Sequence, residues 1–123
     1  MEYKVFKVII AGGRDFNDYD LLKRMCNSIL IRKRQTHTII ILSGLAKGAD
    51  TLAVRYADEQ NFQCLGYTAD WGQFGKSAGI RRNAQMADNA DALIAFWDGS
   101  SRGTKNMIEQ AQAKGLQIRI IKY

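Results

Sequence analysis

Residues 38–50 constrain the fold most, because a short apolar run breaks there at a glycine and restarts as a helix. Residues 38–42 (TIIIL) are too few for a helix and are typical of a strand covered on both faces, as in a parallel sheet. The loop 43–48 (SGLAKG) follows, and apolar residues then recur at helical spacing. Such a turn brings backbone amides and the positive end of a helix together, which suits a phosphate.

The same alternation continues along the chain. Strands are predicted at residues 4–11, 38–42, 62–68, 92–97 and 117–122, helices at 19–33, 49–61, 77–89 and 104–113, and a loop at 69–76. This order predicts one Rossmann-like α/β domain over residues 1–123, a three-layer sandwich with a mainly parallel five-stranded sheet and helices on both faces. Every strand-to-helix loop then lies at the carboxyl edge of the sheet, where ligands bind in such folds.

Composition narrows the class of protein. The chain has 123 residues and a net charge of +6, which favours anionic partners, either nucleotides or nucleic acid. Its apolar runs are far shorter than the roughly 18 residues of a membrane span, and residues 1–4 do not begin a signal peptide, so we expect a cytoplasmic protein with no membrane partner. Cys26 and Cys64 lack metal-ligand spacing and are predicted to be buried free thiols.

Three glycine-bearing loops fall on the predicted ligand edge: residues 12–14, 43–48 and 99–104. Backbone amides there could approach a phosphate, and nearby cations and amide groups could neutralise or orient it. The residues predicted to bind a phosphorylated ligand are Gly12, Gly13, Arg14, Ser43, Gly44, Lys47, Gly48, Arg82, Asn83, Gly103 and Thr104. Two phosphate motifs are disfavoured: the first loop lacks the third glycine of a dinucleotide fingerprint, and Asp70 stands where a P-loop needs glycine.

Trp71 and Phe74 are candidates for stacking on a base, although isolated loop aromatics also form core lids or subunit contacts. The weak candidates for acid-base catalysis are Asp98 and Glu109; the other acids near this edge are Asp15, Asp50 and Asp70. His37 is predicted at the opposite edge, and the sequence has no cluster with metal-ligand spacing. We therefore expect no metal and no cofactor other than a bound nucleotide-like ligand.

Several stretches together resemble one known superfamily. Residues 43–50 (SGLAKGAD) closely resemble the loop of the DprA proteins, and Arg82-Asn83, residues 87–94 and residues 99–115 follow in matching order. With residues 12–16 (GGRDF) at the first strand end, the chain is similar to the SLOG superfamily, which unites the Smf/DprA DNA-processing proteins with the LOG-type nucleoside-phosphate hydrolases. The best match is to its small, stand-alone YspA-like members.

This resemblance implies a Rossmann-like sheet, association into a homodimer or higher homo-oligomer, and a nucleotide pocket formed by the glycine loops. LOG-type hydrolases carry a Gly-Gly-x-Gly-Thr-x-x-Glu signature, and here Met107 stands where the Glu should be. Glu109 comes two residues later and would point roughly 200° away around a helix of about 3.6 residues per turn. The resemblance therefore favours binding over catalysis.

Three hypotheses follow. The favoured one is a module that binds a nucleotide or nucleotide-derived ligand as a sensor or carrier. The second is an N-glycosidic nucleoside-phosphate hydrolase of the LOG type that uses Asp98 or Glu109. The third is a DprA-like binder of single-stranded nucleic acid, with cations along one edge at Lys47, Lys76, Arg81, Arg82, Arg102 and Lys105.

Overall fold

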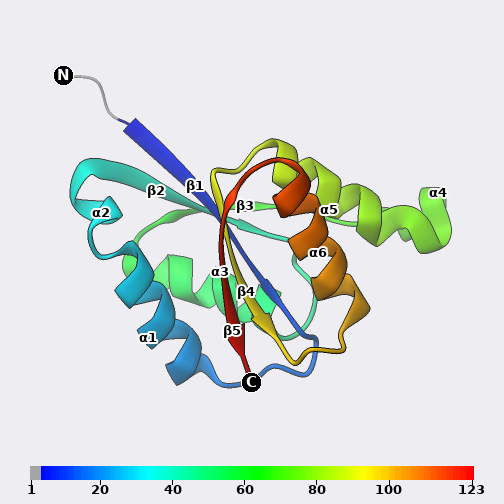
Figure 1. Ribbon diagram of the computed structural model, residues 1–123, viewed down its shortest axis with the longest axis horizontal. Helices are drawn as coiled ribbons and strands as arrows, with labels where there is room; N and C mark the ends of the chain where they lie inside the picture. The colour runs from blue at the N-terminus through cyan, green and yellow to red at the C-terminus, as the bar shows by residue number, and fades with distance from the viewer. Residues whose placement is uncertain (1–3) are drawn as a thin grey trace.

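Five strands form one sheet in the order β3-β2-β1-β4-β5 (Figure 1). The structure is a computed structural model that describes residues 4–123. Its strands are β1 (Lys4–Gly12), β2 (His37–Ser43), β3 (Gln63–Gly66), β4 (Ala92–Trp97) and β5 (Gln117–Lys122). All neighbouring strands are parallel, so the predicted Rossmann-like architecture is confirmed.

Helices connect successive strands and cover both faces of the sheet (Figure 1). They are α1 (Tyr19–Leu30), α2 (Lys33–Thr36), α3 (Ala49–Gln60), α4 (Trp71–Phe74), a 3₁₀ turn η1 (Gly75–Ser77), α5 (Ala78–Asp88) and α6 (Arg102–Ala113). α1 begins after Asp18, whose side chain accepts a hydrogen bond from the Leu21 amide, as expected for an N-cap.

Several sequence-based boundaries were wrong by one or two residues, including the start of α6 at Arg102 in place of residue 104, and three differences are larger or have a clear cause. The helix predicted over residues 19–33 ends at Leu30, and α2 follows as a separate turn. The loop predicted over 69–76 contains α4 and η1, because the Asp70 carboxylate caps α4 by accepting a hydrogen bond from the Gln73 amide at 3.1 Å. The third strand is shorter than residues 62–68, since its pairing with β2 ends where β2 ends, at Ser43 opposite Gly66.

Alternating side chains of the central strands divide the core into two halves. On one face Val8 and Ile10 of β1 pack with buried residues of α1 and α3. On the other face Ile9 and Ala11 pack with buried residues of α5 and α6. Burial of both faces explains why these strands appear in the sequence as nearly continuous apolar runs.

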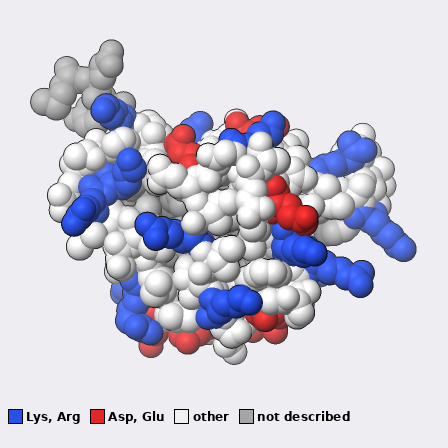
Figure 2. All heavy atoms as spheres, in the orientation of Figure 1, with Lys and Arg blue, Asp and Glu red and all other residues white. Residues whose placement is uncertain are grey.

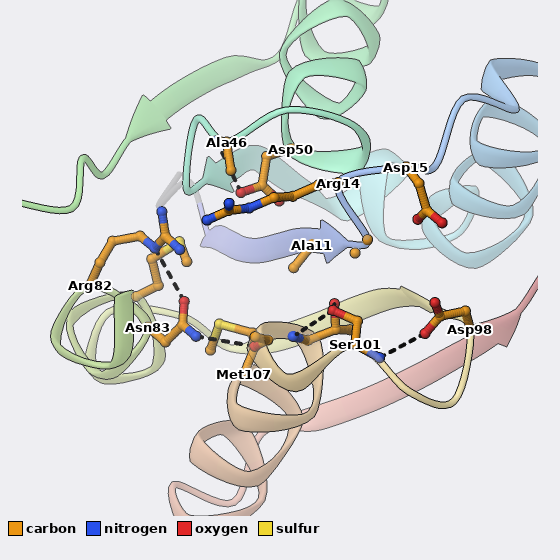
Figure 3. A pocket seen from close by; sticks show the side chains of 15 residues that line it. Ala11, Arg14, Asp15, Ala46, Asp50, Arg82, Asn83, Asp98, Ser101 and Met107 are labelled. Carbon is orange, nitrogen blue, oxygen red and sulfur yellow. Dashed lines mark hydrogen bonds between the residues drawn. The ribbon is translucent and has the colours of Figure 1, made fainter. Parts of the chain in front are cut away.

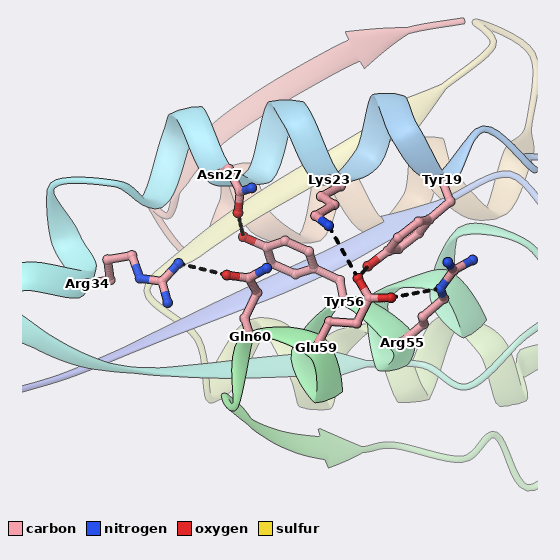
Figure 4. Close-up of polar contacts among 8 residues, drawn as sticks. All are labelled: Tyr19, Lys23, Asn27, Arg34, Arg55, Tyr56, Glu59 and Gln60. Atoms are coloured by element: carbon pink, nitrogen blue, oxygen red, sulfur yellow. Dashed lines mark hydrogen bonds and ion pairs between the residues drawn. The ribbon is translucent and has the colours of Figure 1, made fainter.

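Polar contacts join α1 to α3 on the first face (Figure 4). The Tyr56 hydroxyl donates to Asn27 at 2.7 Å, and the Tyr19 hydroxyl donates to Glu59 at 2.6 Å. Lys23 lies 3.7 Å from the same carboxylate. These contacts fix α3, and with it the loop between β2 and α3 that precedes it.

Three further predictions concern membrane-spanning helices, the two cysteines and the histidine. Within residues 4–123 no helix is both long and apolar enough to cross a bilayer. Cys26 and Cys64 are free thiols; Cys26 is buried and Cys64 only partly so, and burial raises the pKa of Cys26 to about 12. His37 begins β2 and therefore lies at the amino edge, as predicted.

The end of β1 passes very close to neighbouring backbone at Gly12. A Cβ atom there would lie 2.5 Å from the Phe96 carbonyl oxygen of β4 and 2.7 Å from Ala49 Cβ of α3. We predict that Gly12→Ala lowers the free energy of unfolding by about 2 kcal/mol or more, because backbone on both sides must move. Urea denaturation of the purified variant measures this loss.

Gly103→Ala is the matched control for this substitution. A Cβ at Gly103 meets nothing within 4 Å, and the residue lies in α6. Replacing a helical glycine with alanine should leave stability unchanged or raise it by up to about 1 kcal/mol. Equal losses in the two variants would contradict the argument from close approach.

Candidate functional site

A cavity of about 360 Å³ opens at the carboxyl edge of the sheet, where β1 and β4 lie side by side. The order of strands reverses at this pair, so the loops after β1 and β4 lead to opposite faces and leave a crevice between them. Most of the predicted phosphate-binding residues line it: Gly12, Gly13, Arg14, Arg82, Asn83, Gly103 and Thr104.

The first glycine loop is held between β4 and α3. The Gly13 amide donates to the Phe96 carbonyl at 3.2 Å, and the Gly13 carbonyl accepts from the Ala49 amide at 3.2 Å. A Cβ at Gly13 would collide with the Tyr123 hydroxyl, which itself donates to Asp15 at 2.6 Å. Glycine at this position lets the loop pass close to both side chains, and the two backbone hydrogen bonds place Arg14 at the cavity.

Arg14 and Arg82 point their guanidinium groups toward one another over the cavity (Figure 3). Arg82 donates from Nη1 to the Gly44 carbonyl at 2.8 Å and from Nε to Asn83 Oδ1 at 3.2 Å. Within residues 4–123 no hydrogen bond holds the exposed Arg14 side chain. Burial lowers the pKa of Arg82, the Asp50 carboxylate opposes this shift, and the like charge of Arg14 adds to it. An anion between the two guanidinium groups would relieve their repulsion.

Asp50 lies in the first turn of α3 and also lines the cavity. Its side chain is only 6% exposed and accepts a hydrogen bond from the Ala46 amide at 3.3 Å. Burial raises the pKa of Asp50 to about 6, although the Ala46 amide and the charges of Arg82 and Arg14 act in the opposite direction. The carboxyl group therefore titrates near neutrality between two cations.

The loop 43–48 is built by its own hydrogen bonds. The buried Ser43 hydroxyl donates to the Asp50 carbonyl at 2.8 Å and accepts from the Leu45 amide at 3.1 Å. Ser43 therefore shapes the loop and does not line the cavity. The amides of Leu45 and Ala46 are already bonded inside the protein, so the predicted cradle of free amides is partly used by the loop itself.

The other predicted residues of this loop face neighbouring spaces. Gly44 and Lys47 line a second cavity next to the first, which they share with Arg14 and Arg82. Gly48 has φ +81°, and a Cβ there would lie 2.3 Å from the Gly13 carbonyl oxygen. Gly48 therefore allows the first two glycine loops to pack against each other.

The opposite wall comes from the loop after β4 and the start of α6. Asp98 accepts hydrogen bonds from the Ser100 and Ser101 amides at 2.9 and 2.8 Å, and these bonds hold the pKa of Asp98 below its ordinary value. Asp98 lines the cavity as an ionised group that organises its own loop. Ser101 is the N-cap of α6, and its hydroxyl lies 3.1 Å from that of Thr104.

Asn83 joins this wall to α5, because its amide donates to Asn106 at 3.0 Å and to the Gly103 carbonyl at 3.4 Å. Met107 is buried and lies in the cavity wall, at the position expected from the glutamate signature (Figure 3). Glu109 is exposed and does not line the cavity, as its helical offset predicts.

Only one of the two aromatic candidates lines a cavity. Trp71 lines the second cavity, whereas Phe74 lies beneath the Arg81 guanidinium at 4.3 Å and lines neither. Sequence reasoning did not select Ala46, Met86 or Ser101, which complete the first cavity. Met86 follows Asn83 by three positions, so helical spacing could have placed it on the same face.

The described part of the chain, residues 4–123, contains no group of three or more His, Cys, Asp or Glu side chains that could hold a metal ion. The groups that line the cavity include two guanidinium groups, carboxylates, an amide, hydroxyls and two methionine side chains. Such a surface binds an anion through its cations and hydroxyl groups through its carboxylates and amide.

The titration of Asp50 gives a prediction about stability. Folding raises its pKa from 3.8 to about 6, so the native state retains a proton that the unfolded state has lost. This group therefore favours folding at low pH, and its contribution is lost as the pH rises from about 4 to about 6. Asp50→Asn should become more stable relative to the parent by about 2 kcal/mol between pH 4 and pH 7.

Urea denaturation at pH 4, 5, 6 and 7 measures this difference. Asp58→Asn is the control, because it removes an exposed carboxylate from the same helix and should show a much smaller change. A stability difference between Asp50→Asn and the parent that stays constant with pH would contradict the buried titration.

Solved structures with this fold include DNA processing protein A (DprA) from Streptococcus pneumoniae, with a TM-score of 0.74 and 19% identity over 97% of this chain and 51% of that one. This chain thus spans about half the length of the pneumococcal protein. The structural-genomics target TM1055 matches with a TM-score of 0.66 and 19% identity. This match covers 92% of this chain and 72% of TM1055. DprA from Helicobacter pylori matches with a TM-score of 0.62 and 20% identity, covering 96% of this chain and 66% of that one. Its structure is described for its single-stranded DNA binding mode.

Sequence comparison is more specific. The Gene 61 protein of Mycobacterium phage D29 is 31% identical over 118 residues, which cover 91% of this chain and 93% of the phage protein. The sequence model of the YspA, cpYpsA-related SLOG family (YAcAr) matches residues 6–74, more than half of the chain. These matches confirm the superfamily that the glycine loops indicated, and the chain belongs to the YspA, cpYpsA-related SLOG family.

Proposed function

We propose that this protein is a binding module for a nucleotide or nucleotide-derived phosphorylated ligand. The observation that carries the proposal is the facing pair of guanidinium groups, Arg14 and Arg82, over a cavity at the point where strand order reverses. A phosphate placed between them would gain two charge-assisted contacts and remove their mutual repulsion. The cavity volume of about 360 Å³ falls in the range of small-molecule sites.

The remaining lining groups suit the rest of a nucleotide. Asn83 and Thr104 offer polar atoms on one wall, and Asp98 offers a carboxylate that can accept from ribose hydroxyls. Met86 and Met107 line the apolar base of the cavity, although both side chains are almost completely buried. Specificity in this proposal comes from a few polar groups around an apolar base.

Two observations support binding over hydrolysis of an N-glycosidic bond. Met107, a residue without acid-base chemistry, occupies the cavity wall where the LOG-type signature has glutamate. Asp98 is held in its ionised form by two amides and would be a poor proton donor. We therefore propose a sensor or carrier that leaves its ligand intact, acting in the cytoplasm as a homodimer or higher homo-oligomer.

Calorimetric titration with the ribonucleoside 5′-monophosphates tests the proposal, and we expect at least one of them to bind. Arg14→Gln should weaken that binding about 10-fold to 100-fold, because it removes a charge-assisted contact from an exposed side chain that supports no other residue. Arg24→Gln is the matched control, since it removes an equal charge from the exposed surface of α1, outside the cavity.

Native mass spectrometry of the purified protein would show a retained small molecule and the subunit number in one measurement. The proposal fails if no nucleotide binds and no phosphorylated molecule is retained. It also fails if Arg14→Gln and Arg24→Gln weaken binding equally, because the effect would then come from net charge alone.

Single-stranded nucleic acid is the second candidate ligand. It is favoured by exposed cations at Lys47, Arg81 and Lys105, and by the likeness to DprA from Helicobacter pylori, described for single-stranded DNA binding. On the face that Figure 2 shows, however, cations are scattered among acids and form no continuous track. If the candidate is correct, affinity for a single-stranded 20-mer should fall steeply between about 50 and 200 mM salt; weak or salt-independent binding would exclude it.

A further inference from the structure

A second cavity of about 410 Å³ adjoins the first at the ends of β2 and β3. The two share Arg14, Ala46 and Arg82, so the pair of guanidinium groups stands between them. A mononucleotide in the first cavity leaves the second one unused. The shared cations indicate that the two cavities form one continuous site.

The two cavities differ in charge. The first contains carboxylates, Asp15, Asp50 and Asp98, in addition to the two arginines. The residues that line the second, all within the described part of the chain, include Lys47 with the same arginines and no carboxylate. Negative charge on a ligand is therefore favoured at the arginine pair and on the side of the second cavity, and hydroxyl groups are favoured in the first.

Two exposed apolar side chains form walls of the second cavity. Trp71 is 51% exposed and Leu45 is 46% exposed, although both are large and apolar. Leu45 adopts φ 60°, a left-handed conformation that is costly for a leucine, and its side chain lies over Gly66 at the end of β3. The loop thus holds an apolar side chain at the cavity against its conformational preference.

Trp71 and Arg82 both lie near Gly79 of α5. A Cβ at Gly79 would lie 3.4 Å from the Trp71 ring and 3.8 Å from Arg82 Nη2. The indole therefore lies beside the guanidinium that would hold the phosphate. Trp71 is placed by α4, which projects from the body of the protein beyond α5 (Figure 1) and is capped by Asp70.

We propose that the ligand has two nucleoside-like parts joined through phosphate, as in a dinucleoside pyrophosphate. The bridging phosphates lie between Arg14 and Arg82, one nucleoside fills the first cavity, and the base of the other stacks on Trp71 in the second. This proposal rests on the proposed function, because it uses the same arginine pair. A small dinucleotide is favoured over a nucleic-acid strand because the arginine pair is shared by two cavities, of about 360 and 410 Å³, each in the size range of a small-molecule site.

Calorimetry that compares each nucleoside 5′-monophosphate with the symmetrical dinucleoside 5′,5′-pyrophosphate of the same base tests the proposal. We expect the dinucleotide to bind about tenfold or more tightly. Trp71→Ala should remove most of that advantage, because it should weaken binding of the dinucleotide far more than binding of the mononucleotide. The dinucleotide should also quench tryptophan fluorescence in the parent protein, and this quenching should be absent from Trp71→Ala.

Phe74→Ala is the matched control, because Phe74 is an exposed aromatic residue of the same short helix that lies outside both cavities. It should not change either affinity. Equal affinities for mononucleotide and dinucleotide would overturn the two-part ligand but leave the proposed function in place. Absence of binding by both would overturn the two proposals together, and affinity that keeps rising with oligonucleotide length would replace the dinucleotide with a nucleic-acid strand.

Discussion

The candidate site depends on the parallel pairing of β1 with β4, in which Gly12 lies opposite Phe96. This pair is where the order of strands reverses, so the chain leaves β1 toward one face and leaves β4 toward the other. The crevice between the two exits exists only if the first loop can cross close to β4 and α3. Gly12 and Gly13 allow that crossing because a Cβ at either position would overlap neighbouring atoms.

Burial shifts the pKa values of two of the charged groups around this crevice, Arg82 and Asp50. Arg14 and Arg82 are like charges facing one another, and the buried carboxyl group of Asp50 lies near both. With a pKa of about 6, Asp50 is mostly ionised at neutral pH and compensates one of the two cations, and it becomes neutral only as the pH falls below 6.

The proposed function rests on the residues of this chain and not on its structural neighbours. Its likeness to DprA at 19% identity shows a common fold and does not carry the function across. The proposal of ligand binding rests on Met107 in the cavity wall and Trp71 in the second cavity. Both features favour recognition of a ligand over cleavage of one.

Much of the fold was predictable from the sequence because its signals are local. Short apolar runs between helical segments determined the strands, and the glycine loops at their ends determined the edge where ligands would bind. The helical offset between Met107 and Glu109 also follows from sequence, since it depends only on residues per turn. β4 and β5 have the bounds predicted from their apolar runs.

Tertiary structure alone decided which predicted residues share a cavity. Ser43 and Lys47 belong to one loop, yet Ser43 is buried in hydrogen bonds and Lys47 lines the second cavity. Trp71 and Phe74 belong to one helical turn, yet only Trp71 faces a cavity. The sequence by itself determined the alternating elements and the ligand edge, because these depend on periodicity and glycine. Side-chain direction and proximity depend on packing between distant segments, so only the folded chain could decide them.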